Sequence, residues 1–386
     1  MTIPATTLSV SGVRFGATYA LSGPASEAQE RAEAITVEQT IEFPADLVAD
    51  DDIRRHVIGR IESLEAVGPE RSLAHISYAV ETTGFELPQL LNVCFGNCSL
   101  LPGVRLVELH LPVELLARFR GPRHGIKGLR QLLHAGDRPL LATALKPMGL
   151  GSATLAQMAR TLARAGIDVV KDDHGLANQP FAHYEERVRA CAAAVRDANE
   201  ATGGHALYLP SINAPAEEIE PRAHLAKEAG AGGLLVLPGL AGLDMMRRLA
   251  DDDSLALPIM AHPAFLGSYV VDEHGGIEHG LLFGTLARLA GADMSVFPSY
   301  GGRFSFSLAA CRAIATGCRS PLQGVAPILP APGGGMTVDR VGELVAFYGP
   351  DTLLLIGGNL HRGELFDNAR RMQAAVEAAA QSAPTV

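Results

Sequence analysis

Short apolar runs alternate with amphipathic segments from about residue 139 onward, and this rhythm constrains the fold more than any other feature. The repeat is irregular, roughly 25–35 residues, which separates it from a solenoid. Eight apolar runs have the composition of buried parallel strands: 139–145, 167–171, 206–210, 233–238, 257–261, 293–298, 324–329 and 352–356. Amphipathic segments typical of covering helices lie between them: 155–165, 185–200, 218–229, 280–290 and 338–347. Eight consecutive strand–helix units predict a closed (β/α)8 TIM barrel, with a doubly wound open sheet as the alternative.

The residues before about 138 follow a different pattern. Three segments alternate as antiparallel strands do and one has the pattern of an acidic amphipathic helix, in the order strand, helix, strand, strand: 10–22, 25–39, 72–82 and 104–111. This mixture predicts a smaller α+β (ferredoxin-like) domain. We expect an N-terminal domain over 1–137 and the barrel, which carries the active site, over 138–386.

Composition narrows the class of protein. The net charge is −10 and the pI is near 5.7, which argues against a nucleic-acid partner. Five cysteines without a CxxC pair indicate reduced thiols in a cytosol. The chain has no secretory signal pattern and no apolar run near the roughly 18 residues of a membrane span. We therefore expect a cytoplasmic enzyme that does not act at a membrane.

Catalytic groups of a TIM barrel lie at the C-terminal ends of its strands. The ends of the first, second, fifth and sixth predicted strands carry Lys146, Lys171, Asp172, Asp173, His174, His262 and Arg303. An apolar run that ends in a lysine and two acids is typical of a buried strand opening into a site. Carboxylate oxygens beside an amine and an imidazole can hold Mg²⁺ and move protons. The alternative interpretation is a strand end with solvated charges.

Several of these side chains have two interpretations. A buried Lys146 would have a lowered pKa and could abstract a proton, or it could form a salt bridge to Asp172 or Asp173. His262 is either a base or a histidine bonded to neighbouring backbone. Arg303 follows two glycines, as in a mobile loop that closes over an anion, and the alternative is a solvated loop arginine.

Glycines follow the seventh and eighth predicted strands, at Gly333, Gly334 and Gly335 and at Gly357 and Gly358. Backbone N–H groups of such loops can approach an anion, and this is the usual phosphate position of the fold. The sequence therefore predicts a phosphorylated ligand. The residues just beyond, His361 and Arg362, are either phosphate ligands or surface residues, and we interpret them as surface residues.

These residues together resemble the RuBisCO large-chain superfamily over essentially the full chain. The matching runs occur in the family's order: Ala144-Leu145-Lys146-Pro147, Lys171-Asp172-Asp173, Asn178-Gln179-Pro180-Phe181, His262-Pro263-Ala264, Gly334-Gly335 and Gly357-Gly358. In the N-terminal domain, Glu38 and Asn97 lie in segments similar to those that reach into a partner subunit's active site. The resemblance implies a homodimer whose active sites are shared between subunits, with assembly beyond the dimer left open.

The departures from the family pattern are informative. The resemblance implies that Lys171 is carbamylated and joins two carboxylates on Mg²⁺, but the positions are Asp173 and His174. A neutral nitrogen in place of an anionic oxygen weakens Mg²⁺ binding and argues against carbamylation. The family's second lysine near the first strand is Met148, and its loop lysine aligns with Arg303. The chain therefore resembles a RuBisCO-like protein (form IV), the branch that does not carboxylate.

The family's second phosphate site has also changed. Its arginine, histidine and serine correspond to Pro263, Val296 and Gly333, with Phe265 nearby. A second phosphate would meet no counter-charge there, and its desolvation would be prohibitive. The resemblance together with this change implies a sugar monophosphate with a hydrophobic group at its far end.

RuBisCO-like proteins share one first step, enolisation next to a carbonyl of a phosphorylated sugar derivative. The expected reaction is the isomerisation of 5-methylthioribulose 1-phosphate in methylthioadenosine-derived sulfur salvage (methionine salvage), with His174 as a proton shuttle. The alternatives are a decarboxylase of 3-oxo-isoapionate 4-phosphate (apiose catabolism) and a 2,3-diketo-5-methylthiopentyl-1-phosphate enolase. The expected metal ligands are Lys171, Asp173 and His174 on Mg²⁺.

An alternative of another class is a sugar-phosphate-binding protein without turnover. The joint presence of Lys146, Lys171, Asp173 and His262 argues against it, because binding alone needs few of them. Proton exchange from D₂O into a keto-sugar phosphate distinguishes the two.

Overall fold

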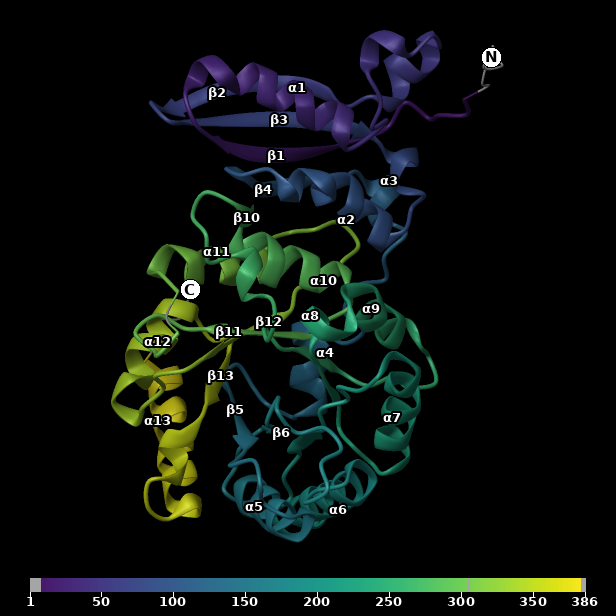
Figure 1. Cartoon of the computed structure of the whole chain (residues 1–386). Helices are drawn as coiled ribbons and strands as arrows, with labels where there is room; N and C mark the ends of the chain where they lie inside the picture. Colours follow the sequence, from purple (N-terminus) through teal and green to yellow (C-terminus); the bar gives the residue numbers. More distant parts are fainter. Residues whose placement is uncertain (1–7, 305, 383–386) are drawn as a thin grey trace. The chain divides into compact units, whose positions relative to one another are not determined.

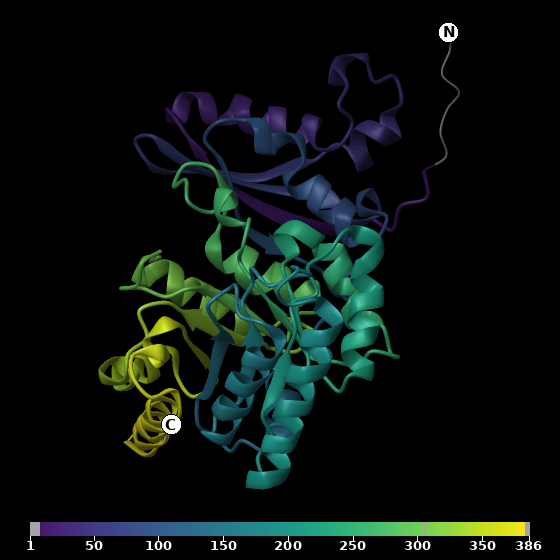
Figure 2. The same cartoon turned by 60° about the horizontal axis from the view of Figure 1, so that its bottom comes forward.

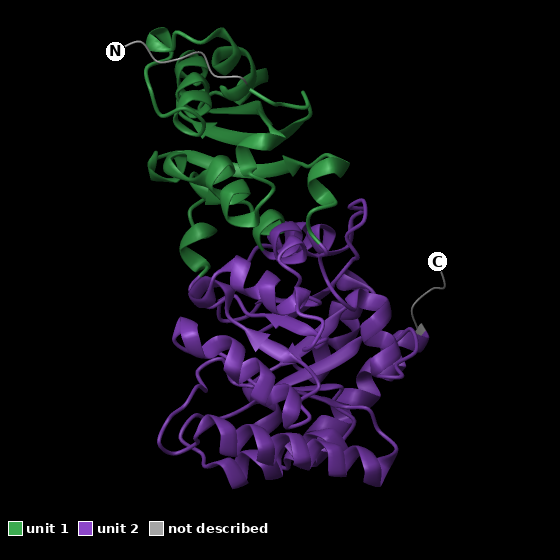
Figure 3. Cartoon of the chain, turned by 90° about the vertical axis from the view of Figure 1, so that its right-hand side faces the viewer, with its two compact units in different colours: residues 1–119, 266–282 green, residues 120–265, 283–386 purple. Residues whose placement is uncertain are grey.

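The structure, a computed structural model of the chain, describes residues 8–304 and 306–382. It divides into two compact units, coloured separately in Figure 3. Their bounds are Met1–Phe119 with Leu266–Leu282 for the first and Arg120–Phe265 with Phe283–Val386 for the second. The units differ from the predicted domains in two ways. The first unit ends at Phe119 and not at residue 137, and segment 266–282 belongs to it because it supplies a strand to its sheet.

The first unit is built on a five-stranded sheet in the order β10-β4-β1-β3-β2 (Figure 1). Strand β1 pairs antiparallel with β3 and β4, β2 pairs antiparallel with β3, and β10 pairs parallel with β4. The bounds are β1 (Arg14–Ser22), α1 (Ala28–Glu38), β2 (Arg60–Gly68), β3 (Arg71–Ala79), α2 (Leu87–Phe95), β4 (Val104–His110), α3 (Val113–Leu116) and β10 (Gly276–Ile277). The expected α+β unit is confirmed.

The sequence pattern did not predict β2. This strand lies at the edge of the sheet, and most of its side chains are exposed, so the alternation of apolar and polar residues is weak. Its neighbour β3 is buried over its second half and was predicted. An edge strand is defined by its pairing partner more than by its own composition.

The second unit is an eight-stranded parallel barrel in the order β7-β6-β5-β13-β12-β11-β9-β8. The strand bounds are β5 (Leu140–Leu145), β6 (Val169–Asp172), β7 (Leu207–Leu209), β8 (Leu234–Val236), β9 (Ile259–Ala261), β11 (Met294–Pro298), β12 (Leu329–Gly333) and β13 (Leu353–Ile356). The end strands meet through a bridge between Ser211 and Leu235, with Ile212 N–H donating to Leu235 O at 3.2 Å. The expected TIM barrel is confirmed.

Helices surround these strands (Figure 1, Figure 2). Their bounds are α4 (Gly125–Leu132), α5 (Ser152–Arg164), α6 (Tyr184–Thr202), α7 (Ala216–Glu228), α8 (Pro238–Ala241), α9 (Leu243–Asp251), α10 (Ala287–Leu289), α11 (Leu308–Arg319), α12 (Val341–Tyr348) and α13 (Leu365–Ser382). None of the helices in the described part of the chain is long and apolar enough to cross a membrane.

The barrel interior is filled by side chains from its strands. Leu140 and Val169 belong to one core cluster with Met260 and Met294, and all four are fully buried. Side chains of α4, including Leu129, join the same cluster. Because α4 precedes the first barrel strand, it closes the N-terminal end of the barrel, and the C-terminal end is left for the site.

The seventh barrel strand was predicted at 324–329, and this was wrong, since β12 runs over Leu329–Gly333. Prolines are rare inside strands, so the sequence pattern with Pro330 and Pro332 did not indicate a strand at 329–333. Leu329 N–H donates to Asp293 O on the β11 side of the strand. Because backbone nitrogens alternate in direction along a strand, the nitrogens of Pro330 and Pro332 face β13. The missing N–H groups explain why β12 pairs with β13 at a single position but with β11 along its whole length.

Candidate active site

Strand β6 presents its charged residues on opposite faces. Lys171 lies two residues after Val169, which belongs to the barrel core, so its side chain faces the interior. It is only 2% exposed, and its Nζ donates to Asp172 O at 3.0 Å. Burial lowers the pKa of Lys171 to about 8. An amine with this pKa is neutral in about one molecule in ten at pH 7.

Asp172 faces outward, toward helix α6. Its carboxylate accepts hydrogen bonds from Arg187 Nε at 3.1 Å, from the Tyr208 hydroxyl at 2.8 Å and from Ser211 N–H at 3.1 Å. Arg187 and Asp172 are both fully buried. Asp172 is therefore committed to the barrel wall and does not face a ligand at the mouth.

Asp173 is the carboxylate that faces the site. It forms an ion pair with Lys146 from the end of β5, and its Oδ1 accepts a hydrogen bond from Gly175 N–H at 3.1 Å. His174 Nδ1 lies 3.2 Å from the same oxygen. Burial acts to raise the pKa of Asp173, but the bonds from Lys146 and Gly175 outweigh it and the net pKa is lowered. The salt-bridge interpretation of Lys146 therefore agrees with its contacts, with Asp173 as the partner.

Two imidazole rings stack beside this carboxylate. The rings of His174 and His262 are 4.5 Å apart and nearly parallel, at 14°. Burial, with Lys171 and His174 nearby, lowers the pKa of His262 to about 2, so the ring is neutral. Its Nδ1 lies 3.2 Å from Ala264 N–H and accepts that hydrogen bond, which leaves the proton on Nε2. In this state His262 offers an N–H donor to a ligand oxygen.

The side chains around Lys171 are a poor ligand set for Mg²⁺, the ion that the resemblance implies. No group of three His, Cys, Asp or Glu side chains in the described residues is arranged to hold a metal ion. Asp172 is saturated by Arg187 and Tyr208, which leaves Asp173 as the carboxylate beside Lys171 and His174. Mg²⁺ prefers oxygen ligands in an octahedral set. The unmodified side chains do not fit this ion, and the Mg²⁺ site of Lys171, Asp173 and His174 stays a prediction.

The glycine loops after β12 and β13 offer free backbone donors. Among the described residues, none accepts a hydrogen bond from the N–H groups of Gly334, Gly335, Gly357 or Gly358. Gly334 and Gly335 have φ values of 86° and 67°, which glycine adopts without strain. Asn359 Nδ2 joins the two loops by donating to Met336 O at 2.7 Å. Free N–H groups in glycine loops of this kind can bind anions, and we define these four glycines as the anion cradle.

Apolar side chains are exposed on the loops at the C-terminal end of the barrel. Met148, Phe181, Phe265 and Phe304 follow β5, β6, β9 and β11, and they are 52%, 42%, 74% and 68% exposed. Of the three positions expected to replace a second phosphate site, Val296 is buried in the barrel core, and Pro263 and Gly333 are half-buried. Exposed apolar groups at a mouth favour a ligand with an apolar end.

His361 differs from its interpretation as a surface residue. It ends a short 3₁₀ helix, Gly358–His361, and is half-buried. Its Nε2 atom is buried and has no hydrogen-bond partner among the described residues. Burial lowers the pKa of His361, and the charge of Lys146 lowers it further, so the two side chains are near each other. The adjacent Arg362 is exposed, as expected.

Two predicted site residues lie in the first unit. Asn97 Nδ2 donates to Glu38 Oε1 at 2.8 Å, although the residues are far apart in sequence. Asn97 is exposed and Glu38 is half-buried. The fold of this unit therefore brings the two residues together, and their role in a partner's site stays a prediction.

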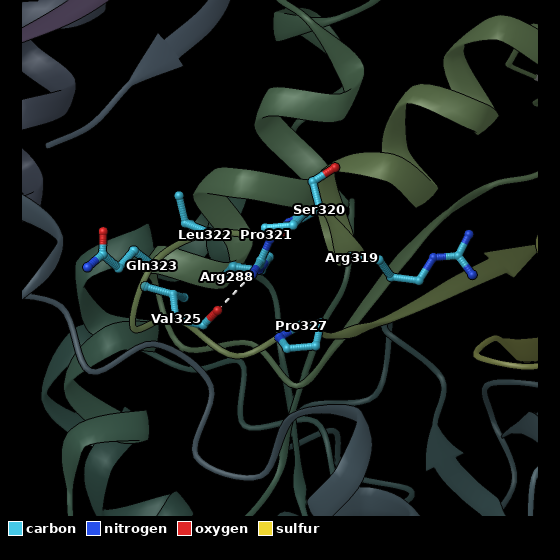
Figure 4. Close-up of a pocket in the computed structure, with 8 residues that line it drawn as sticks. All are labelled: Arg288, Arg319, Ser320, Pro321, Leu322, Gln323, Val325 and Pro327. Atoms are coloured by element: carbon cyan, nitrogen blue, oxygen red, sulfur yellow. Dashed lines mark hydrogen bonds between the residues drawn. The ribbon is translucent and has the colours of Figure 1, made fainter. Parts of the chain in front are cut away.

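A cavity of about 560 Å³ lies at the opposite end of the barrel strands, before β12 begins (Figure 4). Arg288 reaches it from α10, and its guanidinium donates to the carbonyls of Gly317, Ser320, Val325 and Ala326. Two of these carbonyls lie at the end of α11, where helix carbonyls lack partners. Arg288 thus has a capping function there, away from the mouth.

Comparisons with known proteins agree with this geometry. Residues 125–301 match the family described as the ribulose bisphosphate carboxylase large chain, catalytic domain. The 5-methylthioribulose-1-phosphate isomerase of Rhodospirillum rubrum is 37% identical over 348 residues, 90% of this chain and 91% of that protein. The 2,3-diketo-5-methylthiopentyl-1-phosphate enolase of Geobacillus thermodenitrificans is 34% identical over 360 residues, 89% of this chain and 87% of that protein.

A solved structure is similar over nearly the whole chain. The crystal structure of a Rubisco-like protein from Rhodopseudomonas palustris superposes with a TM-score of 0.86 and 38% identity, over 94% of this chain and 97% of that chain. A match over 94% of this chain extends into both compact units. The chain therefore belongs to the ribulose bisphosphate carboxylase large-chain family, as one of its RuBisCO-like proteins.

Proposed function

We propose that this protein is a non-carboxylating enzyme that enolises a phosphorylated keto-sugar and isomerises 5-methylthioribulose 1-phosphate in methionine salvage. The observation that carries the proposal is the combination at one barrel mouth of the anion cradle, a buried amine with a lowered pKa and exposed apolar side chains. A phosphate, an acidic C–H group and an apolar methylthio end need these three features. We place the enzyme in the cytoplasm.

The proposed proton transfer uses residues of this chain. The cradle N–H groups bind the phosphate. Lys171, neutral in part at pH 7, removes the proton from the carbon next to the carbonyl. His262 Nε2–H donates to the oxygen on which negative charge develops. Lys146, which forms an ion pair with Asp173, or His174 beside it, returns a proton to the neighbouring carbon, and Arg303 closes over the anion.

Enzymes of this family generally use Mg²⁺. Bound at Asp173, the ion would supply electrostatic stabilisation of an enediolate. Because the unmodified set does not fit it, we propose that binding requires a carbamate on Lys171, which adds a second anionic group beside His174. In that form the carbamate, and not the free amine, would be the base.

We also propose a homodimer in which Glu38 and Asn97 complete the partner's site. Their hydrogen bond and the exposure of Asn97 support the proposal, because the pair is already formed and presented at the surface of its unit. Assembly beyond the dimer stays open.

The enolase reaction is the second candidate, favoured by the 34% identical enolase of Geobacillus thermodenitrificans. His174, a neutral nitrogen in place of a second carboxylate, favours the isomerase. The decarboxylase of 3-oxo-isoapionate 4-phosphate is less favoured, because its carboxylated and hydroxylated substrate does not match the exposed Phe265 and Met148.

The deciding experiment follows deuterium from D₂O into 5-methylthioribulose 1-phosphate, the diketo phosphate and 3-oxo-isoapionate 4-phosphate by NMR. Exchange into the first, followed by an isomeric product, supports the isomerase. If only the diketo phosphate reacts, the protein is the enolase and not the isomerase. If only 3-oxo-isoapionate 4-phosphate reacts, it is the decarboxylase. Tight binding of all three without exchange would favour a sugar-phosphate-binding protein.

A further inference from the structure

Two glycine-containing loops touch at the mouth. The segment Tyr300–Arg303 follows β11, and Gly334 and Gly335 follow β12. A Cβ added to Gly302 would lie 3.0 Å from the carbonyl carbon of Gly334, and one added to Gly335 would lie 3.0 Å from Gly302 Cα. The backbones are therefore in contact without room for a side chain between them.

The backbone itself contributes little to holding this contact. Ser299 N–H donates to Gly333 O at 2.8 Å, where the two strands end. Beyond that point the described residues form no backbone–backbone hydrogen bond between the loops. Glycine pairs have high conformational freedom, so a segment of this kind stays ordered only if side chains fix it.

Arg340 supplies the missing connection. Its Nη1 donates to Tyr300 O at 3.4 Å and to Gly335 O at 3.2 Å. Its guanidinium also lies over the Tyr300 ring, 5.2 Å from the centroid. One side chain thus bonds a carbonyl of each loop, and the planar guanidinium is suited to this because its donors point in fixed directions.

Arg340 is itself held in place. It ends a 3₁₀ helix, Val338–Arg340, at the start of α12, and its Nε and Nη2 donate to Glu343 at 3.2 Å. The guanidinium side chain is 23% exposed. The ring of Tyr300 packs against Phe347 of the same helix, with centroids 4.9 Å apart. Helix α12 therefore anchors the arginine and the first residue of the loop together.

We propose that Arg340 is a positioning residue that ties the Tyr300–Arg303 segment to the anion cradle, so that an anion bound at Gly334 and Gly335 orders the loop that carries Arg303. The inference rests on the proposed function, because it takes the cradle as the phosphate site. The physical link is short: the same Gly335 that presents a free N–H to the anion has its carbonyl fixed by Arg340.

Trypsin cleavage after Arg303 measures this tie directly, because Arg303 is exposed and followed by Phe304. The full-length protein, R340Q, R340K and R189Q are digested briefly with and without inorganic phosphate, and fragments are quantified by mass spectrometry. R189Q is the matched control, since Arg189 forms an exposed ion pair with Glu185 on α6, away from the mouth.

Without phosphate, we expect R340Q to be cut after Arg303 about tenfold faster than the wild type, with an intermediate rate for R340K. R189Q should be cut at the wild-type rate, and cleavage at other arginines and lysines should not change. Phosphate should slow cleavage after Arg303 in the wild type and have little effect in R340Q.

Equal cleavage of R340Q and wild type after Arg303, equal protection of both by phosphate, or faster cleavage at all sites would overturn the proposal. Calorimetry of phosphate binding separates a failure of the role of Arg340 from a failure of the proposed function. If the wild type binds no phosphate, the cradle assignment fails, while the comparison without phosphate still decides whether Arg340 orders the loop.

Discussion

Arg187 of helix α6 and Asp172 of strand β6 form a fully buried ion pair, with Arg187 Nε 3.1 Å from Asp172 Oδ2. The remaining arginine donors bond the carbonyls of Ala177 and Ala182, which lie in the loop after β6. This one side chain therefore fixes both the strand that carries Lys171 and the loop that follows it. The pair therefore holds the backbone of the candidate site in place from the outer face of the barrel, on the side of helix α6.

Replacing Asp172 with Asn should destabilise the protein by about 3–5 kcal/mol, because the Arg187 charge is left buried without its carboxylate. Urea unfolding measures this change. Asp197→Asn is the control, since Asp197 forms a half-exposed pair with Arg160 and should change stability by less than about 1 kcal/mol. Equal effects of the two substitutions would contradict the supporting role of the buried pair.

The sequence predicted the barrel because seven of its eight strands are apolar runs of the expected length. It also predicted that Lys146, Asp173 and His262 lie together, because parallel strand ends meet at one edge. It did not predict Arg187 or Arg340. Both lie on helices, and their partners are set by tertiary packing that a pattern along the chain does not contain. For Arg187, the available signal was its position on the apolar face of its helix, between Tyr184 and Val188, which are both buried.

Lys171→Met should lower the rate of deuterium exchange into substrate by at least about a hundredfold, because it removes the proposed base. In CO₂-free buffer, where Lys171 of the wild type carries a free amine, the exchange rate should rise about tenfold between pH 6 and pH 7 and level off above about 8. The sign follows from the lowered pKa of Lys171, whose neutral form increases until the pH passes that value. A rate that falls over this range would assign the proton abstraction to another group.

His361→Leu should leave stability unchanged or raise it, while substrate affinity falls about tenfold. The buried Nε2 has no partner in the described residues, so its removal relieves a desolvation cost. His361 lies near Lys146 and ends the short helix that follows Gly357. This position indicates that a bound ligand supplies the hydrogen-bond partner of Nε2. Arg362→Gln is the control and should change neither quantity. A variant that loses stability and retains affinity would indicate a purely structural histidine.

Mg²⁺ affinity should depend on CO₂. With Lys171 unmodified, Asp173 offers a carboxylate that is already paired with Lys146, and binding should be weak. Bicarbonate should increase Mg²⁺ affinity at least about tenfold in the wild type and have no effect in Lys171→Met. Calorimetry with and without bicarbonate measures both. Equal affinity in CO₂-free and bicarbonate-containing buffer would rule out the carbamate as a ligand.

The first unit should lose stability in acid through Glu278. Bonds from His279 and Arg105 outweigh burial and lower the pKa of Glu278 to about 2, from its usual value near 4.5. A carboxyl group whose pKa is lowered by folding stabilises the protein above its unfolded pKa, and this contribution is lost as the pH falls from about 4.5 to about 2. The shift corresponds to about 3 kcal/mol at most.

Glu278→Gln should therefore be less stable than the wild type at pH 7 and nearly equal to it at pH 2.5, as measured by urea unfolding at each pH. The control is Glu65→Gln on the exposed edge strand β2, which should follow the wild-type curve throughout. Since Arg105 is buried and also bonds the carbonyls of Asp272 and Gly275, the glutamine variant keeps the segment that supplies β10 in place. A constant difference between the two proteins from pH 7 to pH 2.5 would show that Glu278 stabilises through packing and not through its charge.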